Sequence, residues 1–149
     1  PSGRCRCSEK EVRRYQSRIS GPLLDRIDII IEASALDFEE LSRRRPAESS
    51  AEIKKRVDAA RQVQRRRYGD RLLSNAYIGP KELRQYCSPD AEGQQLMHAA
   101  FDAMGLSARS YDRILRVART IADLEGSENI NAGHIAEAVQ YRSYDFREN

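Results

Sequence analysis

The sequence has no tryptophan, three phenylalanines and no long apolar run, and these absences limit the kind of protein it encodes. Its longest aliphatic stretches are a few residues, such as residues 29–31. A helix that spans a bilayer needs about 20 apolar residues, and a secretory signal about 7 to 15. We therefore expect no membrane segment and a core that is mostly aliphatic.

Cysteine is also scarce. Three cysteines are an odd number and too few for a disulfide framework, which indicates a reducing compartment, with the cytoplasm as the expected location. Two thiolates spaced as Cys5 and Cys7 can both face a metal, but a structural zinc site needs four ligands and the sequence offers no second pair. Alone, the two residues are interpreted as thiols without a metal or as a piece of a longer site.

Several catalytic motifs are missing. The chain contains no G-x-x-x-x-G-K-[ST], G-x-G-x-x-G, G-x-S-x-G or H-E-x-x-H pattern, which excludes a complete active site of those classes. His98 and His134 fall within helical patterns and are interpreted as packing or surface residues. Cys87 is interpreted as a buried, unreactive thiol.

Charge is distributed unevenly along the 149 residues, whose net charge is +3. Residues 1–18 and 54–71 are strongly basic, and the rest of the chain is acidic. Such basic segments can bind polyanions locally even when the total charge is modest. Within the second segment, the candidates for binding DNA are Arg56, Arg61, Arg65 and Arg66. A solvated helix face explains the same pattern equally well, and the sequence does not decide between the two.

Capping signals and apolar spacing predict a series of helices. Ser8 with Glu11 and Ser49 with Glu52 fit capping boxes, and Gly69 suits the C′ position of the second helix. The predicted helices cover residues 9–19, 49–68, 80–86, 88–104 and 107–126, and a last one begins at Asn131. The short turns between them predict a compact antiparallel bundle.

One strand and one connection are predicted before that bundle. Residues 27–33 alternate and are rich in β-branched side chains, which favours a strand. Residues 34–49 contain Pro46, several serines and weak periodicity, so we interpret them as a linker. The predicted fold is mainly α: a remnant of an α/β core over residues 1–33, the linker, and a helical domain over residues 50–149.

Two arginines stand out by their positions. Arg26 lies at an element boundary directly before the predicted strand, and Arg109 lies in the first turn of the most regular helix. A guanidinium fits poorly at the positive end of a helix dipole, which indicates an anionic partner. The alternatives are local ion pairs, of Arg26 with Asp25 or Asp28 and of Arg109 with Asp102 or Asp112, and spacing alone leaves both open.

Long stretches of the sequence resemble one family. Residues 18–29 (RISGPLLDRIDI) and 105–127 (GLSARSYDRILRVARTIADLEGS) resemble the motif after sensor 1 and the lid of magnesium-chelatase-like AAA+ ATPases. SSAEIKKR at 49–56 and HIAEAVQYR at 134–142 are in register with the same family. The resemblance implies the C-terminal part of such an ATPase, with the phosphate loop and Walker B acid upstream of Pro1, so that this stretch alone would be inactive.

The resemblance also implies roles for particular residues. The expected assembly is a hexameric ring of identical subunits that binds ATP and Mg²⁺ at the seams between them. Arg26 matches the arginine finger, and Arg109 matches the sensor-2 arginine, which acts in cis or in trans. A second cysteine pair upstream would complete a zinc loop with Cys5 and Cys7, and we expect no stoichiometric zinc in this stretch alone.

The implied substrate depends on the group within the family. One group acts as DNA helicases that promote branch migration during natural transformation, and the cysteine pair and residues 49–56 resemble that group. Chelatase subunits instead use similar rings to insert a metal into a porphyrin. Two further hypotheses remain from the composition: an autonomous basic helical module that binds DNA, and a plain assembly domain.

Overall fold

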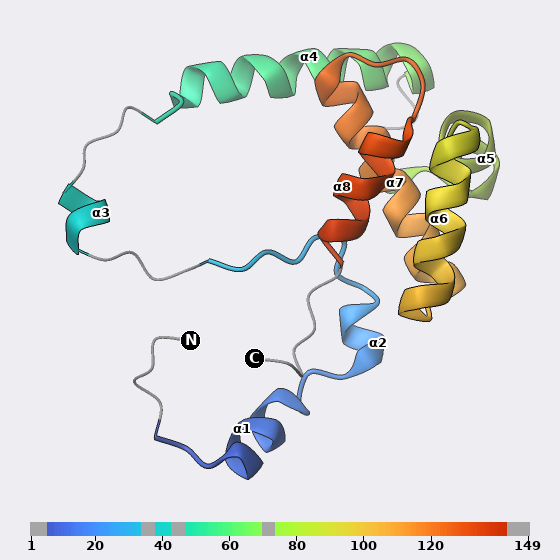
Figure 1. The fold of residues 1–149 in the computed structure, drawn as a ribbon. Coiled ribbons are helices and arrows are strands. Elements are labelled where there is room, and N and C mark those ends of the chain that lie inside the picture. The colour runs from blue at the N-terminus through green and yellow to red at the C-terminus, as the bar shows by residue number, and fades with distance from the viewer. Residues whose placement is uncertain (1–5, 34–37, 43–46, 70–73, 143–149) are drawn as a thin grey trace.

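The computed structural model describes residues 6–33, 38–42, 47–69 and 74–142. Their helices gather into a bundle toward the C-terminus, and three shorter helices precede it (Figure 1). The bundle consists of α4 (Ser50–Tyr68), α5 (Pro80–Tyr86), α6 (Ala91–Met104), α7 (Ala108–Glu125) and α8 (Ala132–Gln140), with a 3₁₀ turn, η2 (Asn75–Tyr77). The prediction of a mainly helical fold is confirmed. In the part of the chain that the model describes, no helix combines the length and hydropathy that crossing a bilayer requires.

The bundle is organised around α7. This helix packs against α4, α5, η2 and α8, and α6 packs against α8. Ile114, Ala118 and Ala122 of its predicted apolar stripe are fully buried, together with Ile130 and Ile135 of the following segment. A spacing of four residues places Ile114, Ala118 and Ala122 on one face of α7, so a single helix forms the centre of the core.

The ends of the helices follow the predicted capping signals closely. The backbone N–H of Ser49 donates to the carboxylate of Glu52 at 2.9 Å, and α4 ends at Gly69, as predicted. Helix α7 runs between the caps Ser107 and Gly126, and Gly126 adopts a left-handed conformation at φ 78°. Helix α6 begins later than predicted, because the carboxylate of Asp90, rather than a group at 88–89, accepts from the backbone of Gly93 at 2.7 Å.

Gly93 lies where α6 approaches the turn before α8. The backbone N–H of Asp90 donates to the carbonyl of Ile130 at 2.9 Å, which holds these two segments together. A Cβ atom at Gly93 would lie 2.9 Å from Cβ of Pro89 and 3.4 Å from the backbone carbon of Asn131. The glycine that weakens the sequence pattern of this helix is therefore required by the packing.

The predicted strand over residues 27–33 is wrong. These residues are described and have no regular secondary structure. The backbone N–H of Ile30 donates to the carbonyl of Tyr141 at 2.9 Å, but no strand among the described residues lies alongside to continue a ladder. Alternating β-branched residues favour a strand only where a neighbouring strand is present, and here that neighbour is absent from the described part.

The three N-terminal helices are short: α1 (Glu9–Gln16), α2 (Gly21–Leu24) and α3 (Phe38–Ser42). Helix α1 is shorter than the predicted helix over residues 9–19. Helices α2 and α3 were not predicted, and α3 falls within the predicted linker of residues 34–49. No residue of α1 or α2 is buried. Figure 1 shows α1 and α3 apart from the bundle and α2 beside it. The division at residues 34–49 stays a prediction.

Candidate functional site

Arg26 follows directly after α2 and is exposed. Its backbone N–H donates to the carbonyl of Leu23 at 3.0 Å, which fixes the turn. Its guanidinium makes no hydrogen bond or ion pair with any described residue. The two carboxylates that could have neutralised it point elsewhere: Asp25 toward the start of α7, and Asp28 toward Arg113. The local ion pairs considered as an alternative do not form.

Arg109 is exposed in the first turn of α7. The hydroxyl of Ser107 accepts from the backbone N–H of Ser110 at 3.1 Å, so the turn that carries Arg109 is capped. Its guanidinium also lacks an ionic partner among the described residues, and Asp102 pairs with His98 at 3.2 Å instead. The helix dipole disfavours a cation at this end of the helix, and the Arg109 guanidinium forms no ion pair with a described residue to offset that cost.

One set of hydrogen bonds brings the segments of these two arginines together. The carboxylate of Asp25 accepts from the hydroxyl of Ser110 at 2.9 Å and from that of Ser107 at 3.2 Å. Asp25 precedes Arg26, and the two serines flank Arg109. The structure therefore places two residues that are 83 positions apart in the sequence on adjoining backbone segments.

Arg142 also connects the segment of Arg26 to the segment of Arg109. Its side chain is only 7% exposed, and it donates to the carbonyl of Ile27 at 2.6 Å and to the hydroxyl of Ser110 at 3.1 Å. Burial lowers the pKa of Arg142, and the nearby charge of Asp25 opposes that shift. Asp25, Ser110 and Arg142 were not singled out from the sequence, because nothing in local spacing signals contacts over this separation.

The basic residues of α4 are in three situations. Arg56 pairs with Glu48 at 2.6 Å, which neutralises one of the positive charges of residues 54–71. Arg61, Arg65 and Arg66 are exposed. Arg67 turns inward. A solvated face and a DNA-binding face both require this exposure, so the two alternatives stay open, but the last arginine of the run belongs to the interior.

Arg67 is part of a buried network between α4, η2 and α7. Its guanidinium donates to both oxygens of Asp123, at 2.5 and 2.9 Å, and Arg119 donates to the same carboxylate at 3.1 Å. Asn75 adds a third donor at 2.9 Å. Burial of Asp123 opposes ionisation, but the hydrogen bonds from Arg67 and Asn75 outweigh it and lower its pKa. This network fixes α4 on the bundle.

The predicted half-site for zinc is only partly described. Cys5 lies outside the described residues, and Cys7 is exposed just before α1. The described residues contain no group of three or more His, Cys, Asp or Glu side chains placed to hold a metal. They do not fit a zinc site, so zinc in a longer protein stays a prediction.

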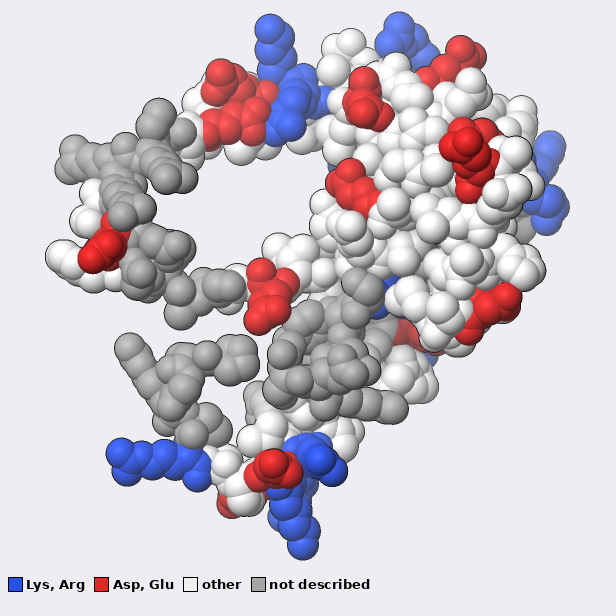
Figure 2. Space-filling view, in the orientation of Figure 1, with Lys and Arg blue, Asp and Glu red and all other residues white. Residues whose placement is uncertain are grey.

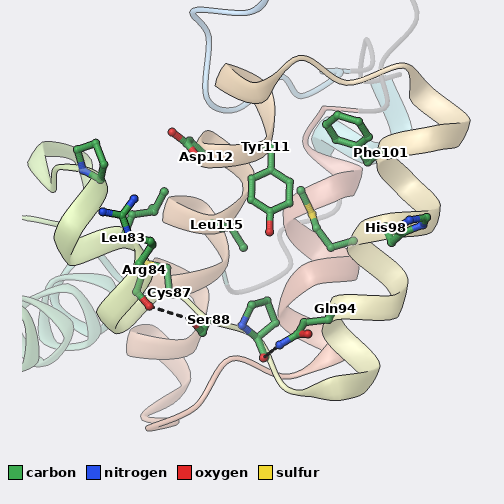
Figure 3. A pocket seen from close by; sticks show the side chains of 13 residues that line it. Leu83, Arg84, Cys87, Ser88, Gln94, His98, Phe101, Tyr111, Asp112 and Leu115 are labelled. Atoms are coloured by element: carbon green, nitrogen blue, oxygen red, sulfur yellow. Dashed lines mark hydrogen bonds between the residues drawn. The ribbon is translucent and has the colours of Figure 1, made fainter.

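A groove of about 640 Å³ lies between α5, α6 and α7. Figure 3 shows Tyr111 projecting into it from α7, with Leu115 behind and Phe101 at its rim. Cys87 lines it, but burial raises the pKa of this thiol to about 11, so it stays protonated at neutral pH. His98 turns toward Asp102 on the surface. The groove offers apolar surface and no activated nucleophile.

His134 has a structural role, as the sequence predicted. Its Nδ1 accepts from the backbone N–H of Asn131 at 3.0 Å, and its Nε2 faces Glu125. The residue is buried and completes the cap of α8. It therefore has no free position from which to act as a base.

Two family models match the chain. Residues 47–142 match the magnesium chelatase subunit ChlI C-terminal model, and residues 1–41 match the magnesium chelatase subunit ChlI model. The first match covers more than half of the sequence, and the chain belongs to the magnesium chelatase family. The predicted resemblance is confirmed.

Individual relatives agree with this assignment. The chain is 40% identical over 141 residues to the uncharacterized protein YifB of Escherichia coli. This match covers 94% of the chain and 27% of YifB. It is 39% identical over 139 residues to the competence protein ComM of Haemophilus influenzae, covering 93% and 27% respectively. An uncharacterized protein of Mycobacterium bovis is 32% identical over 139 residues, again 93% of the chain and 27% of the relative. The chain thus spans about a quarter of the length of these relatives.

Proposed function

We propose that this chain supplies two arginines, Arg26 and Arg109, to ATP hydrolysis in a ring of AAA+ subunits that acts on DNA. One observation carries the proposal: hydrogen bonds from Ser107 and Ser110 to Asp25 join the segments that bear the two arginines, and both guanidinium groups are exposed without an ionic partner among the described residues. Two exposed cations on adjoining segments, neither with an ion pair among the described residues, are suited to an anion supplied from outside the described chain.

The proposed chemistry is stabilisation of a transferring phosphoryl group. A guanidinium donates two parallel hydrogen bonds to phosphate oxygens, and it stabilises the negative charge that spreads over them in the transition state. ATP would supply that phosphate and Mg²⁺ would neutralise its neighbouring oxygens. The chain has no phosphate loop of its own. Another segment or subunit must therefore hold the nucleotide.

The two arginines would have different tasks. Arg26 would act as the arginine finger. Arg109, on the helix at the centre of the bundle, would transmit the presence of the terminal phosphate to the orientation of that bundle. The hydrogen bonds that join their segments favour an arrangement in which both approach the same nucleotide.

Replacing Arg26 in a protein that joins this chain to a phosphate-binding segment tests the proposal. For Arg26→Ala we expect kcat for ATP to fall by about 10³ to 10⁵, while ATP binding is retained. Arg109→Ala should also lower turnover. The matched control is Arg84→Ala, because Arg84 is an exposed arginine on a different helix, α5. Unchanged turnover in Arg26→Ala would contradict the finger assignment.

DNA as the substrate is supported by α4 and by one relative. Lys55, Arg65 and Arg66 are exposed on α4 and make no ion pair with described residues. Figure 2 shows blue side chains along α4 and at the α1 end of the molecule. One relative is named a competence protein. Clustered cations bind DNA by displacing counterions from its phosphates.

Duplex binding by the 149-residue chain measures this contribution. We expect binding that weakens steeply with salt, and Arg65→Ala and Arg66→Ala should each reduce the slope of log K against log[salt] by about 0.9. Arg84→Ala is again the control. Tight binding by the isolated chain would favour an autonomous DNA-binding module. A slope that is unchanged in both α4 variants would contradict a role for α4.

A chelatase-type role is the second candidate function, and the names of both matching family models favour it. The two candidates differ in what stimulates ATP hydrolysis. A DNA motor responds to DNA, whereas a chelatase subunit promotes insertion of a metal into a porphyrin. Measuring turnover of the longer protein with each addition separates them.

A further inference from the structure

The segment that carries Arg26 is held to the bundle by polar contacts on both of its sides. Before Arg26, Asp25 accepts hydrogen bonds from Ser107 and Ser110. After it, the carbonyl of Ile27 accepts from Arg142 at 2.6 Å, and Asp28 forms an ion pair with Arg113 of α7. The arginine itself takes no part in these contacts.

Arg142 connects three of the groups involved. One of its nitrogens reaches the carbonyl of Ile27, and another donates to the hydroxyl of Ser110 at 3.1 Å and lies 3.7 Å from Asp25. A planar guanidinium can hold several acceptors in one fixed arrangement, which a lysine ammonium cannot reproduce. Its burial further restricts the directions in which it can point.

The contacts also continue along the backbone beyond Asp28. The N–H of Ile30 donates to the carbonyl of Tyr141, the residue before Arg142, at 2.9 Å. Segment 25–30 is therefore attached both to α7, through Arg113 and the two serines, and to the end of α8, through Tyr141 and Arg142. Apolar packing contributes little here, since Ile27 and Ile29 are 37% and 51% exposed.

We propose that Arg142 and Arg113 are positioning residues for Arg26: they fix segment 25–30 on the bundle, so that Arg26 and Arg109 move as one unit. This inference rests on the proposed function, because it assigns Arg142 and Arg113 an effect on turnover through Arg26. Neither residue needs to touch the nucleotide. The bundle and the finger segment then respond together to a change at either arginine.

The first test concerns structure alone and uses the 149-residue chain. Hydrogen exchange at the amide of Ile30 reports on the attachment of the segment. For Arg142→Gln we expect exchange at this amide to accelerate at least about 10-fold, while protection of the core of α7 is unchanged. Ser110→Ala, which removes only a hydroxyl, keeps the test available if the first variant folds poorly. Arg84→Gln is the control, and unchanged exchange at Ile30 in both variants would overturn the proposal.

The second test measures turnover in the longer protein with a double-mutant cycle. Misplacing a catalytic group by about 1 Å costs about 100-fold in rate, so Arg142→Gln should lower kcat by that order with little change in KM for ATP. In an Arg26→Ala background the same substitution should have no further effect, because coupled residues are not additive. Independent, multiplying effects would overturn the positioning role and leave the finger assignment intact.

A rescue experiment addresses the second positioning residue. Arg113→Asp and Asp28→Arg should each lower kcat, and the double variant, which restores the ion pair in the opposite orientation, should recover much of the loss. No recovery would count against the pair. If Arg26→Ala itself leaves kcat unchanged, the proposed ATPase function fails, whereas the exchange experiment still decides whether the segment is held by Arg142.

Discussion

The bundle of α4 to α8 and the N-terminal region, residues 6–33 and 38–42, differ in how deeply their apolar side chains are buried. In the bundle, Ile114, Ile130 and Ile135 are completely buried. In the N-terminal region, Tyr15 and Ile31 are 71% and 72% exposed, although both regions contain similar residue types. The bundle is therefore stabilised by a hydrophobic core of its own, whereas residues 25–30 of the N-terminal region are attached to it by polar contacts.

The largest effect is expected from the buried network of the bundle. Asp123→Ala removes the carboxylate that neutralises Arg67 and Arg119, leaving the buried Arg119 and the partly buried Arg67 without a counter-charge. Breaking a buried pair in this way costs about 3 to 5 kcal/mol. Urea denaturation measures the loss. Asp58→Ala, which removes an exposed pair with Lys54, is the control and should cost less than about 1 kcal/mol.

Matched isoleucine substitutions test the comparison directly. Ile114→Ala should destabilise the bundle by about 2 to 5 kcal/mol, because it opens a cavity in the core. Ile31→Ala should change the free energy of unfolding by less than about 0.5 kcal/mol, as is usual at exposed positions. Equal effects in the two denaturation curves would show that the N-terminal region has a core of its own.

Substitution of one glycine in each region compares the same two environments, with a smaller expected effect. Gly93→Ala places a methyl group 2.9 Å from Pro89, and the overpacking cost of about 1 to 3 kcal/mol exceeds the roughly 1 kcal/mol gained in helix propensity. Gly21→Ala, at the start of α2, meets nothing within 4 Å. Thermal unfolding should show a lower Tm for the first variant only, and a lowered Tm for both would weaken the comparison.

The smallest effect is a dependence on pH. Hydrogen bonds from Arg67 and Asn75 lower the pKa of Asp123 despite its burial, so its contribution to stability is present above its ordinary value of 3.8 and is lost as the pH falls through the lower value of the folded state. Asp123→Asn has no carboxylate at this position and therefore lacks this pH-dependent contribution to stability. The difference in free energy of unfolding between wild type and variant should therefore narrow below pH 4. A constant difference would show that the carboxylate does not titrate with folding.

The sequence was sufficient to predict most of the bundle. Capping residues such as Ser49, Ser107 and Asn131 act within a few positions of themselves, and the apolar stripe of α7 needs only local spacing to be recognised. The strand over residues 27–33 was not predictable in the same way, because a strand depends on a neighbour that local sequence does not contain. The alternating pattern of residues 27–33 therefore indicated a propensity for a strand, and the segment did not form one.

The candidate site shows a similar limit. Arg26 and Arg109 were found through their positions and a family resemblance, and their roles stay predictions. Arg113 and Arg142 hold the segment that carries Arg26. The sequence around them gives no sign of this role, since their partners lie 85 and 115 positions away. Arg67 was grouped with a solvated charge run, because the sequence does not reveal which member of such a run turns toward a buried aspartate.

Contact between Arg142 and the carbonyl of Ile27 has a consequence for how the protein is made. The two residues are separated by 115 positions, so the loop between them must close before they meet. During synthesis, which proceeds from the N-terminus, residues 25–30 leave the ribosome long before their partner at the end of α8 exists. The segment that carries Arg26 therefore gains this contact late in synthesis, and a chain interrupted before residue 142 would lack it.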